Sequence, residues 1–357
     1  MNNIKQRNEP VKTLKNIAEE MGVSEATVSY VYNDKWKQKK INASLAERVS
    51  KKLKEEKYRP NVLGLQLKTK KTRTIGIILG DLTRNFNLNI MAGIERILTQ
   101  KGYFSLVCSS NLGQLEEEQL EILLQRNMDG IIFAPLSNRE NTAKVIKNLI
   151  EENLPIVLVD NYIPGLKTDF VVSDNYLGTY QAIDYLIKSG KSKIAYIGSK
   201  KGLTALGDRF KGYETALKEE KIPLEQNLLC WQIEEYQGIH SSMENLFSEE
   251  KPDALFVESL MYFKEGFGFL SEKGYRIPDD IALVGFDPVD LNLSEMQEVD
   301  LPSVVRQPIP FVEQQGTKMG ELAAEILLDR IGGKEGEASQ IFLKPELKFF
   351  NGKENNG

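Results

Sequence analysis

From Thr74 onward, short apolar runs rich in β-branched residues alternate with stretches of helical periodicity. About eight such runs follow one another along the chain, at residues 75–79, 104–108, 130–134, 155–160, 193–198, 228–233, 254–257 and 281–286. Near-continuous apolar strands separated by helices indicate parallel sheets that helices cover on both faces. Eight units exceed one ordinary sheet, so the sequence predicts a body of two α/β subdomains, each a doubly wound parallel sheet.

The charge of the chain is divided unevenly. Residues 1–74 hold 18 Lys and Arg against 8 Asp and Glu, a net charge of +10, whereas the whole chain carries −5. A small basic module on an acidic body indicates that only the N-terminus meets a polyanion. A lysine-rich head that is merely solvated would give the same charge.

Helical periodicity inside the basic module separates these two interpretations. Thr13 is a suitable N-cap for a helix that ends at Gly22, Ser24 begins a second helix, and a third is expected from about Asn42 to Glu56. Two short helices joined through a glycine turn form a helix-turn-helix unit. Such hairpins also occur in proteins that bind no nucleic acid, but the added positive charge favours DNA binding.

Several other classes of protein are disfavoured by what the sequence lacks. No apolar stretch approaches the ~20 residues of a membrane span, and the first residues lack the apolar core of a signal peptide. One histidine, His240, and two distant cysteines disfavour a zinc site or a Ser-His-Asp triad. Neither GxGxxG nor a P-loop is present, and no spacing points to a pair of catalytic carboxylates. We therefore expect a cytoplasmic protein without cofactor or metal and with no enzymatic activity.

The order of several segments resembles the LacI/GalR (lactose-repressor) family of transcription regulators over nearly the whole chain. These segments include "LKNIAEEMGVSEATVSYVYN", "KYRPNVLGLQL", "TRTIGIIL", "DGIIFAP", "DRFKGYETAL", "IPDDIALVGFD" and "MGELAAEILLDRI". The resemblance implies a small all-α helix-turn-helix domain joined to a periplasmic-binding-protein-like clamshell. The expected domains are 1–59 (DNA-binding), 60–73 (hinge helix and linker), 74–174 with 303–331 (N-terminal subdomain), and 175–302 with 332–357 (C-terminal subdomain).

The same resemblance implies a ligand-responsive repressor that binds palindromic operator DNA as a homodimer, with a tetramer left open. A sugar is the expected effector, and a nucleobase or another small molecule acting as corepressor is the alternative. A solute-binding protein would share the clamshell without needing residues 1–74. Deleting residues 1–73 separates a regulator, which keeps only ligand binding, from an enzyme, which keeps turnover.

For DNA, the resemblance places Glu25, Ala26 and Tyr30 nearest the base edges, with Tyr30 where the family usually has Arg. Leu67 matches the hinge leucine that enters the minor groove, a wedge that kinks the duplex; the alternative is a leucine packed on its own domain. The full set of expected DNA-binding residues is Thr13, Ser24, Glu25, Ala26, Thr27, Ser29, Tyr30, Asn33, Asn61 and Leu67. The lysine-rich turn "NDKWKQKKI" exceeds the family's usual length, and either adds phosphate contacts or is a solvated loop.

For the effector, Asp160 and Asp287 each follow an apolar strand, where ligands of open α/β sheets bind. Arg209 and Asp287 match ligand-gripping positions of the family, and Phe86 and Asn87 would line the opposite lobe. The expected effector-binding residues are Phe86, Asn87, Asp160, Arg209, Ile233, Ser259 and Asp287. The alternative for each carboxylate is that it only caps a helix or turn. "FVESL" replaces the Asn-Asp pair usual at Ser259, which predicts a pocket with shorter polar reach.

Overall fold

The computed structural model of the protein describes residues 12–59, 71–109, 116–136, 140–200, 202–232, 239–287, 305 and 307–350. The chain forms two compact units that divide in sequence after Thr72. Of the expected hinge, residues 60–70 lie outside the described residues, and Asn61 and Leu67 lie there too.

Within residues 12–59, the N-terminal unit contains the three predicted helices: α1 (Leu14–Met21), α2 (Glu25–Tyr32) and α3 (Ala43–Glu55). Thr13 caps α1 in a capping box, and Gly22 ends that helix with a φ of 65°, a conformation that favours glycine. Ser24 caps α2 by accepting the backbone N–H of Thr27 at 3.1 Å. These capping interactions confirm the predicted helix starts.

Apolar side chains from all three helices form one core, in which Ile17, Val28 and Val49 are fully buried. On the surface, Glu20 accepts hydrogen bonds from Lys12 at 2.6 Å and from Lys52 at 2.8 Å. These two contacts lower the pKa of Glu20 to about 2. Because Lys52 belongs to α3, they join α1 to α3 and leave the outer face of α2 uninvolved.

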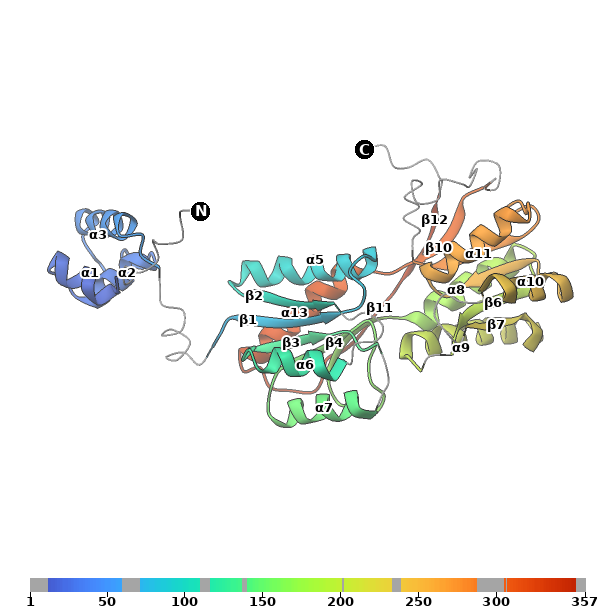
Figure 1. Ribbon diagram of the computed structural model, residues 1–357, viewed down its shortest axis with the longest axis horizontal. Helices are drawn as coiled ribbons and strands as arrows, with labels where there is room; N and C mark the ends of the chain where they lie inside the picture. Colours follow the sequence, from blue (N-terminus) through green and yellow to red (C-terminus); the bar gives the residue numbers. More distant parts are fainter. Residues whose placement is uncertain are drawn as a thin grey trace, which may run out of the picture. The chain divides into compact units, whose positions relative to one another are not determined.

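The first lobe of the second unit contains a parallel sheet with strand order β11-β5-β4-β3-β1-β2. Its strands are β1 (Thr74–Leu79), β2 (Phe104–Ser109), β3 (Gly130–Phe133), β4 (Ile156–Val159), β5 (Asp169–Ser173) and β11 (Gln340–Leu343). Its helices are α5 (Asn85–Gln100), α6 (Glu116–Leu124), α7 (Glu140–Glu151) and α13 (Gly316–Ile331). α5 and α13 cover one face of the sheet, and α6 and α7 cover the other (Figure 1).

The second lobe repeats this plan with strand order β12-β10-β9-β8-β6-β7. Its strands are β6 (Ile194–Ser199), β7 (Leu229–Gln232), β8 (Ala254–Val257), β9 (Ala282–Phe286), β10 (Ile309–Glu313) and β12 (Glu346–Phe350), of which β12 is antiparallel. α8 (Asn175–Lys188) and α9 (Thr204–Glu219) cover one face; α10 (Ile239–Glu249) and α11 (Leu260–Glu272) cover the other. A short 3₁₀ turn, η1 (Gln226–Leu228), leads into β7.

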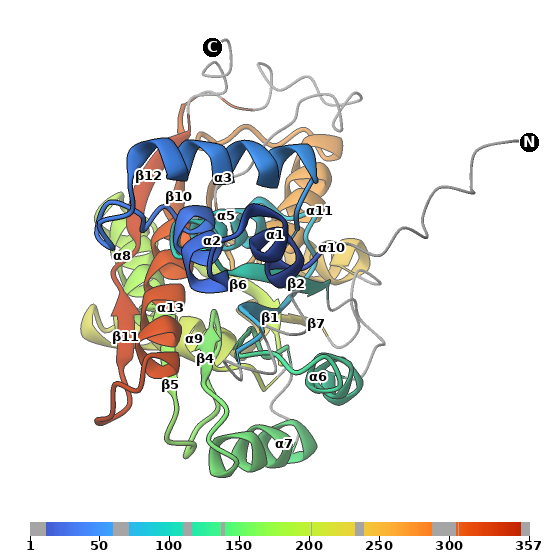
Figure 2. The ribbon, with the colours of Figure 1, turned by 90° about the vertical axis from the view of Figure 1, so that its left-hand side faces the viewer.

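The chain crosses between the lobes three times within the described residues, after β5, after β10 and after β11. These crossings correct the expected subdomain boundaries. β10 (309–313) pairs in the second sheet although 303–331 was assigned to the N-terminal subdomain, and β11 (340–343) pairs in the first although 332–357 was assigned to the C-terminal one. The last two expected boundaries, at residues 302/303 and 331/332, therefore lie too early in the chain: the crossings come only after β10 and after β11, because each lobe takes an additional strand from the C-terminal segment. In Figure 2, α13 and β11 accordingly lie beside β4 and β5.

Candidate functional sites

Two carboxylates occupy equivalent places in the two lobes. Asp160 directly follows β4 in the first lobe, and Asp287 directly follows β9 in the second. Both have left-handed backbone, with φ of 65° and 70°, which Asp tolerates better than most residues. They lie within electrostatic range of each other and of the Arg209 guanidinium. The structure thus brings together three of the residues expected to bind the effector.

Arg209 is held rigidly on α9, with only 5% of its surface exposed. Its Nε donates to Oδ1 of Asn175 at 2.8 Å, and its Nη1 donates to the backbone carbonyl of Glu258. The guanidinium lies over the ring of Phe286, 3.6 Å from the ring centroid. Among the described residues Nη2 forms no hydrogen bond, so within this part of the chain one edge of the planar guanidinium is unpaired.

The carboxylates of Asp160 and Asp287 have little contact with water, which disfavours their charged forms. Burial raises the pKa of Asp160 from its ordinary 3.8 to about 6; Asp287 adds to this effect, while Arg209 and Arg84 oppose it. Burial also raises the pKa of Asp287, opposed by Arg209 and by a hydrogen bond from Gln314. Carboxylates that lack enough donors are suited to accept hydrogen bonds from the hydroxyl or N–H groups of a ligand.

Asn161, which the sequence reasoning missed, connects the two lobes at this site. Its Nδ2 donates to Oδ2 of Asp160 at 3.1 Å, and its Oδ1 accepts the backbone N–H of Ala205 at 3.1 Å. The Thr204 hydroxyl oxygen accepts a further hydrogen bond from the backbone N–H of Tyr162 at 3.1 Å. Because Ala205 stands one turn before Arg209 on α9, Asn161 ties the Asp160 carboxylate to the helix that carries the arginine. In the sequence, the position of Asn161 next to Asp160 at the end of an apolar strand could have indicated this role.

Glu258 is a second residue that the sequence reasoning did not select. It follows β8 and is fully buried, accepting hydrogen bonds from the Tyr196 hydroxyl at 2.6 Å and from the Ser199 backbone N–H. Burial raises the pKa of Glu258 to about 7, while those bonds and Arg209 oppose the rise. Next to it, the buried Oγ of Ser259 has no hydrogen-bond partner among the described residues. In the sequence, the position of Glu258 directly after an apolar strand could have pointed to this residue.

The first lobe contributes Phe86 and Asn87 from the first turn of α5. Phe86 is half-buried against the core of its own lobe. Asn87 is buried, and its Nδ2 donates to the backbone carbonyl of Asp81 at 2.8 Å, so its amide holds the loop after β1. Ile233 lies outside the described residues.

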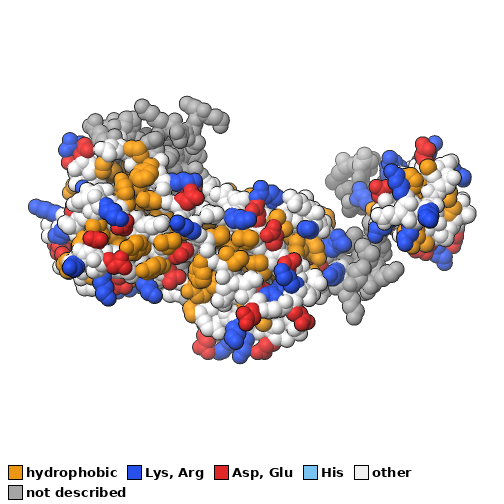
Figure 3. All heavy atoms as spheres, turned by 180° about the vertical axis from the view of Figure 1, so that it is seen from behind, with side chains coloured by type: hydrophobic (Ala, Val, Ile, Leu, Met, Phe, Trp, Pro, Cys, Tyr) orange, Lys and Arg blue, Asp and Glu red, His pale blue; other side chains and the backbone are white. Residues whose placement is uncertain are grey.

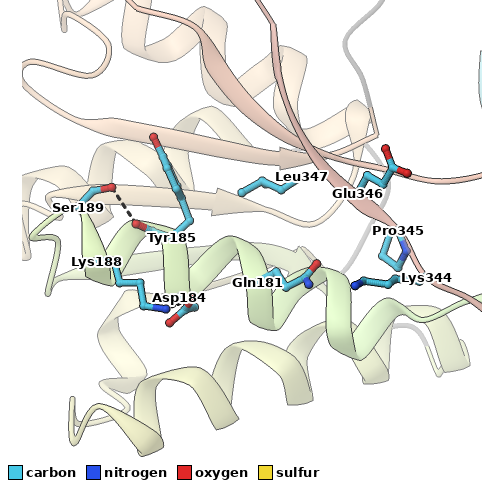
Figure 4. Close-up of a pocket in the computed structure, with 9 residues that line it drawn as sticks. All are labelled: Gln181, Asp184, Tyr185, Lys188, Ser189, Lys344, Pro345, Glu346 and Leu347. Atoms are coloured by element: carbon cyan, nitrogen blue, oxygen red, sulfur yellow. Dashed lines mark hydrogen bonds and ion pairs between the residues drawn. The ribbon is translucent and has the colours of Figure 1, made fainter.

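An open pocket of about 670 Å³ lies elsewhere, between α8 and the strand β12 (Figure 4). Some of its polar side chains are already bonded to neighbours: Lys188 pairs with Asp184 at 2.7 Å, and the Ser189 hydroxyl donates to the backbone carbonyl of Tyr185 at 2.8 Å. It contains none of the residues predicted to bind the effector. The cluster of Asp160, Asp287 and Arg209 is therefore the better candidate for a ligand site.

On α2, Val28 and Val31 are buried, while Glu25 and Ala26 are exposed and Tyr30 is half-buried. Two predicted DNA contacts already have structural partners: the hydroxyls of Ser24 and Thr27 lie 2.8 Å apart. Two others do as well, since Thr13 caps α1 and the Nδ2 of Asn33 donates to the Ser29 carbonyl at 2.8 Å. Lys and Arg side chains lie on the surface of this unit (Figure 3).

Comparison with known proteins decides the family. Residues 13–61 match the bacterial regulatory proteins of the lacI family, and residues 183–349 match the periplasmic binding protein-like domain. The HTH-type transcriptional regulator RegA of Clostridium saccharobutylicum is 31% identical, covering 94% of this chain and 97% of its own. The chain belongs to the LacI family. The HTH-type transcriptional repressor PurR of Vibrio atlanticus (strain LGP32) is 29% identical, covering 94% and 96%.

The fold of this LacI-family chain agrees with that of a solved lac repressor dimer bound to operator and the anti-inducer ONPF. That structure has a TM-score of 0.78 and 21% identity, and the match covers 95% of this chain and 98% of the repressor. The expected fold is thereby confirmed, and the protein is a ligand-responsive, DNA-binding transcription regulator. No helix among the described residues is long and apolar enough to span a membrane.

Proposed function

We propose that this LacI-family protein is a repressor of a carbohydrate-utilisation operon that works in the cytoplasm and binds a palindromic operator as a homodimer. The observation that supports this most is the cluster formed by Asp160 and Asp287, at strand ends of the two lobes, and by Arg209 of α9. An open arginine fork and two carboxylates suit a ligand rich in hydroxyl groups. No step in this role requires catalysis.

A response to effector requires that the ligand bind the DNA-bound and released states with different affinity. We expect Asp287→Ala and Arg209→Ala to abolish the response while effector-free operator binding stays near wild type, if the ligand is an inducer. If it is a corepressor such as a nucleobase, both variants lose tight operator binding with or without ligand. Fluorescence anisotropy with labelled operator measures this, and Lys188→Ala in the open pocket is the matched control. A variant that still responds at wild-type ligand concentrations would place the site elsewhere.

For DNA, we propose that α2 enters the major groove with Glu25, Ala26 and Tyr30 at the base edges. Burial of Val28 and Val31 turns the opposite face of the helix toward the groove. Thr27 and Ser29 then contact phosphates, which position the protein without specifying sequence. Binding-site selection with Tyr30→Ala tests this assignment, which an unchanged sequence preference would refute.

The hinge proposal concerns residues outside the described part of the chain and rests on the sequence. Asn61 would cap a short helix, and Leu67 would enter the minor groove at the operator centre. A circular-permutation gel assay should show less bending with Leu67→Ala, while nonspecific, salt-sensitive binding survives. Equal bending by wild type and variant would remove Leu67 from this role.

The dimer proposal finds support on the surface of the first lobe. β2 is an edge strand whose Phe104 is 75% exposed, and Leu106 on the same strand is also exposed, as is Leu88 on α5. Exposed apolar edge strands are prone to pair with another chain. Phe104→Lys should weaken self-association in sedimentation-velocity experiments, whereas Ile122→Lys, at an exposed apolar position on α6, should not. Equal effects of the two substitutions would exclude this edge as the interface.

A further inference from the structure

The turn between α2 and α3 is a built element of the DNA-binding unit. The Lys35 backbone N–H donates to the Tyr30 carbonyl at 2.8 Å, and the Ile41 N–H donates to the Trp36 carbonyl at 2.9 Å. Trp36 packs partly buried against the helical core, and its indole N–H donates to Oδ1 of Asp34 at 3.1 Å. These contacts hold residues 34–41 in one conformation, so groups on this turn lose little freedom when a partner binds.

Four exposed ammonium groups project from this turn, those of Lys35, Lys37, Lys39 and Lys40. None of them forms an ion pair with a described residue, whereas Lys12 and Lys52 of the same unit are both paired with Glu20. The carboxylate of Asp34 is already bonded to the Trp36 indole. A fixed turn with unpaired cations is complementary to a polyanion.

Lys39 differs from the other three in its position. Its Nζ lies over the Tyr30 ring, 5.2 Å from the ring centroid. Lys37 instead lies over the Trp36 ring, at 5.3 Å. The cation–π contact therefore holds the Lys39 ammonium against the side chain that is proposed to meet the base edges.

We propose that Tyr30 and Lys39 form one composite base reader, in which Lys39 supplies the hydrogen-bond donors. The tyrosine hydroxyl offers a single donor, whereas an ammonium offers three and accepts none. Held beside Tyr30, these donors match the N7 and O6 acceptors of a guanine in the major groove. Lys35, Lys37 and Lys40 have no such link to α2 side chains and contact phosphates only. This inference rests on the proposed function of α2.

The test compares the full-length protein with Lys39→Gln, Lys39→Arg, Tyr30→Ala and the matched control Lys37→Gln. Binding-site selection from a random duplex library gives the base preference, and titrations at several salt concentrations give the slope of log K against log [salt]. We expect Lys39→Gln to relax the preference at the same base pair as Tyr30→Ala, and to lose about tenfold or more in affinity for the selected site. Lys39→Arg, which keeps the positive charge and its donors, should retain the wild-type base preference.

The control should behave differently. Lys37→Gln should weaken binding to all sequences alike and reduce the salt slope by about one. If Lys39→Gln keeps the wild-type preference and behaves like Lys37→Gln, Lys39 is a phosphate contact and the composite reader is wrong. If the wild-type protein itself selects no sequence, the proposed function fails, which is a distinguishable result.

Discussion

The raised pKa of Asp160 predicts that removing this charge stabilises the protein. Each pKa unit corresponds to about 1.4 kcal/mol, so the difference between 3.8 and about 6 amounts to about 3 kcal/mol. Because the pKa of Asp160 is higher in the folded than in the unfolded state, its protonated form contributes to the wild-type stability. That contribution is fully present below pH 4 and is lost as the pH rises through 6. Asp160→Asn keeps the side-chain shape and cannot ionise. We therefore expect the variant to equal wild type near pH 4 and to exceed it by up to about 3 kcal/mol at pH 8.

Urea denaturation followed by circular dichroism at pH 4, 6 and 8 measures this difference. The matched control is Asp169→Asn in the same lobe, because Asp169 is an aspartate that is buried and fully partnered. It accepts two bonds from Arg330, each 2.9 Å, and one from the Ser339 N–H at 2.7 Å. Breaking that pair should destabilise the protein by about 3 kcal/mol. A destabilised Asp160→Asn at pH 8, or a gap that does not change with pH, would refute the reasoning.

Three further predictions concern packing and capping. Gly93→Ala should destabilise the protein by about 3 kcal/mol in urea denaturation, because its Cβ would overlap the Thr317 carbonyl on α13. Tyr196→Phe should cost about 1–3 kcal/mol; losing this donor raises the pKa of Glu258 further, so the loss should grow as the pH is raised above 7 in the same assay. Ser24→Ala should cost the N-terminal unit about 1 kcal/mol, seen as faster amide exchange at Thr27 by NMR.

Most of the strands that the sequence predicted are nearly uninterrupted apolar runs, although β2 contains Ser105 and β7 ends in Gln232. β1 and β6, which come first in the chain in their respective sheets, are buried along nearly their whole length. Such long apolar runs are easily recognised in a sequence.

Four strands were not predicted, namely β5, β10, β11 and β12. In three of them a charge, a proline or an alternating pattern shortens the apolar run. β5 begins with the buried Asp169, β10 contains Pro310, and β11 alternates between exposed and half-buried positions. Position in the sheet does not separate the two groups, because the predicted β2 and β7 lie at sheet edges and the missed β5 and β10 lie inside. Local sequence therefore reveals strands with a long apolar run and misses strands in which a charge, a proline or an alternating pattern shortens that run.

The site shows the same limit in chemical terms. Asp160, Asp287 and Glu258 each follow an apolar strand, so sequence gives all three one signature. Their roles differ because their partners differ: Glu258 receives the Tyr196 hydroxyl and the Ser199 N–H, from a strand about sixty residues earlier. Asp160 receives one amide from its neighbour Asn161. A carboxylate that the protein has supplied with donors holds the structure together, whereas one left short of donors is stabilised by whatever ligand supplies them. Only the folded chain reveals which is which, because the donors come from other strands.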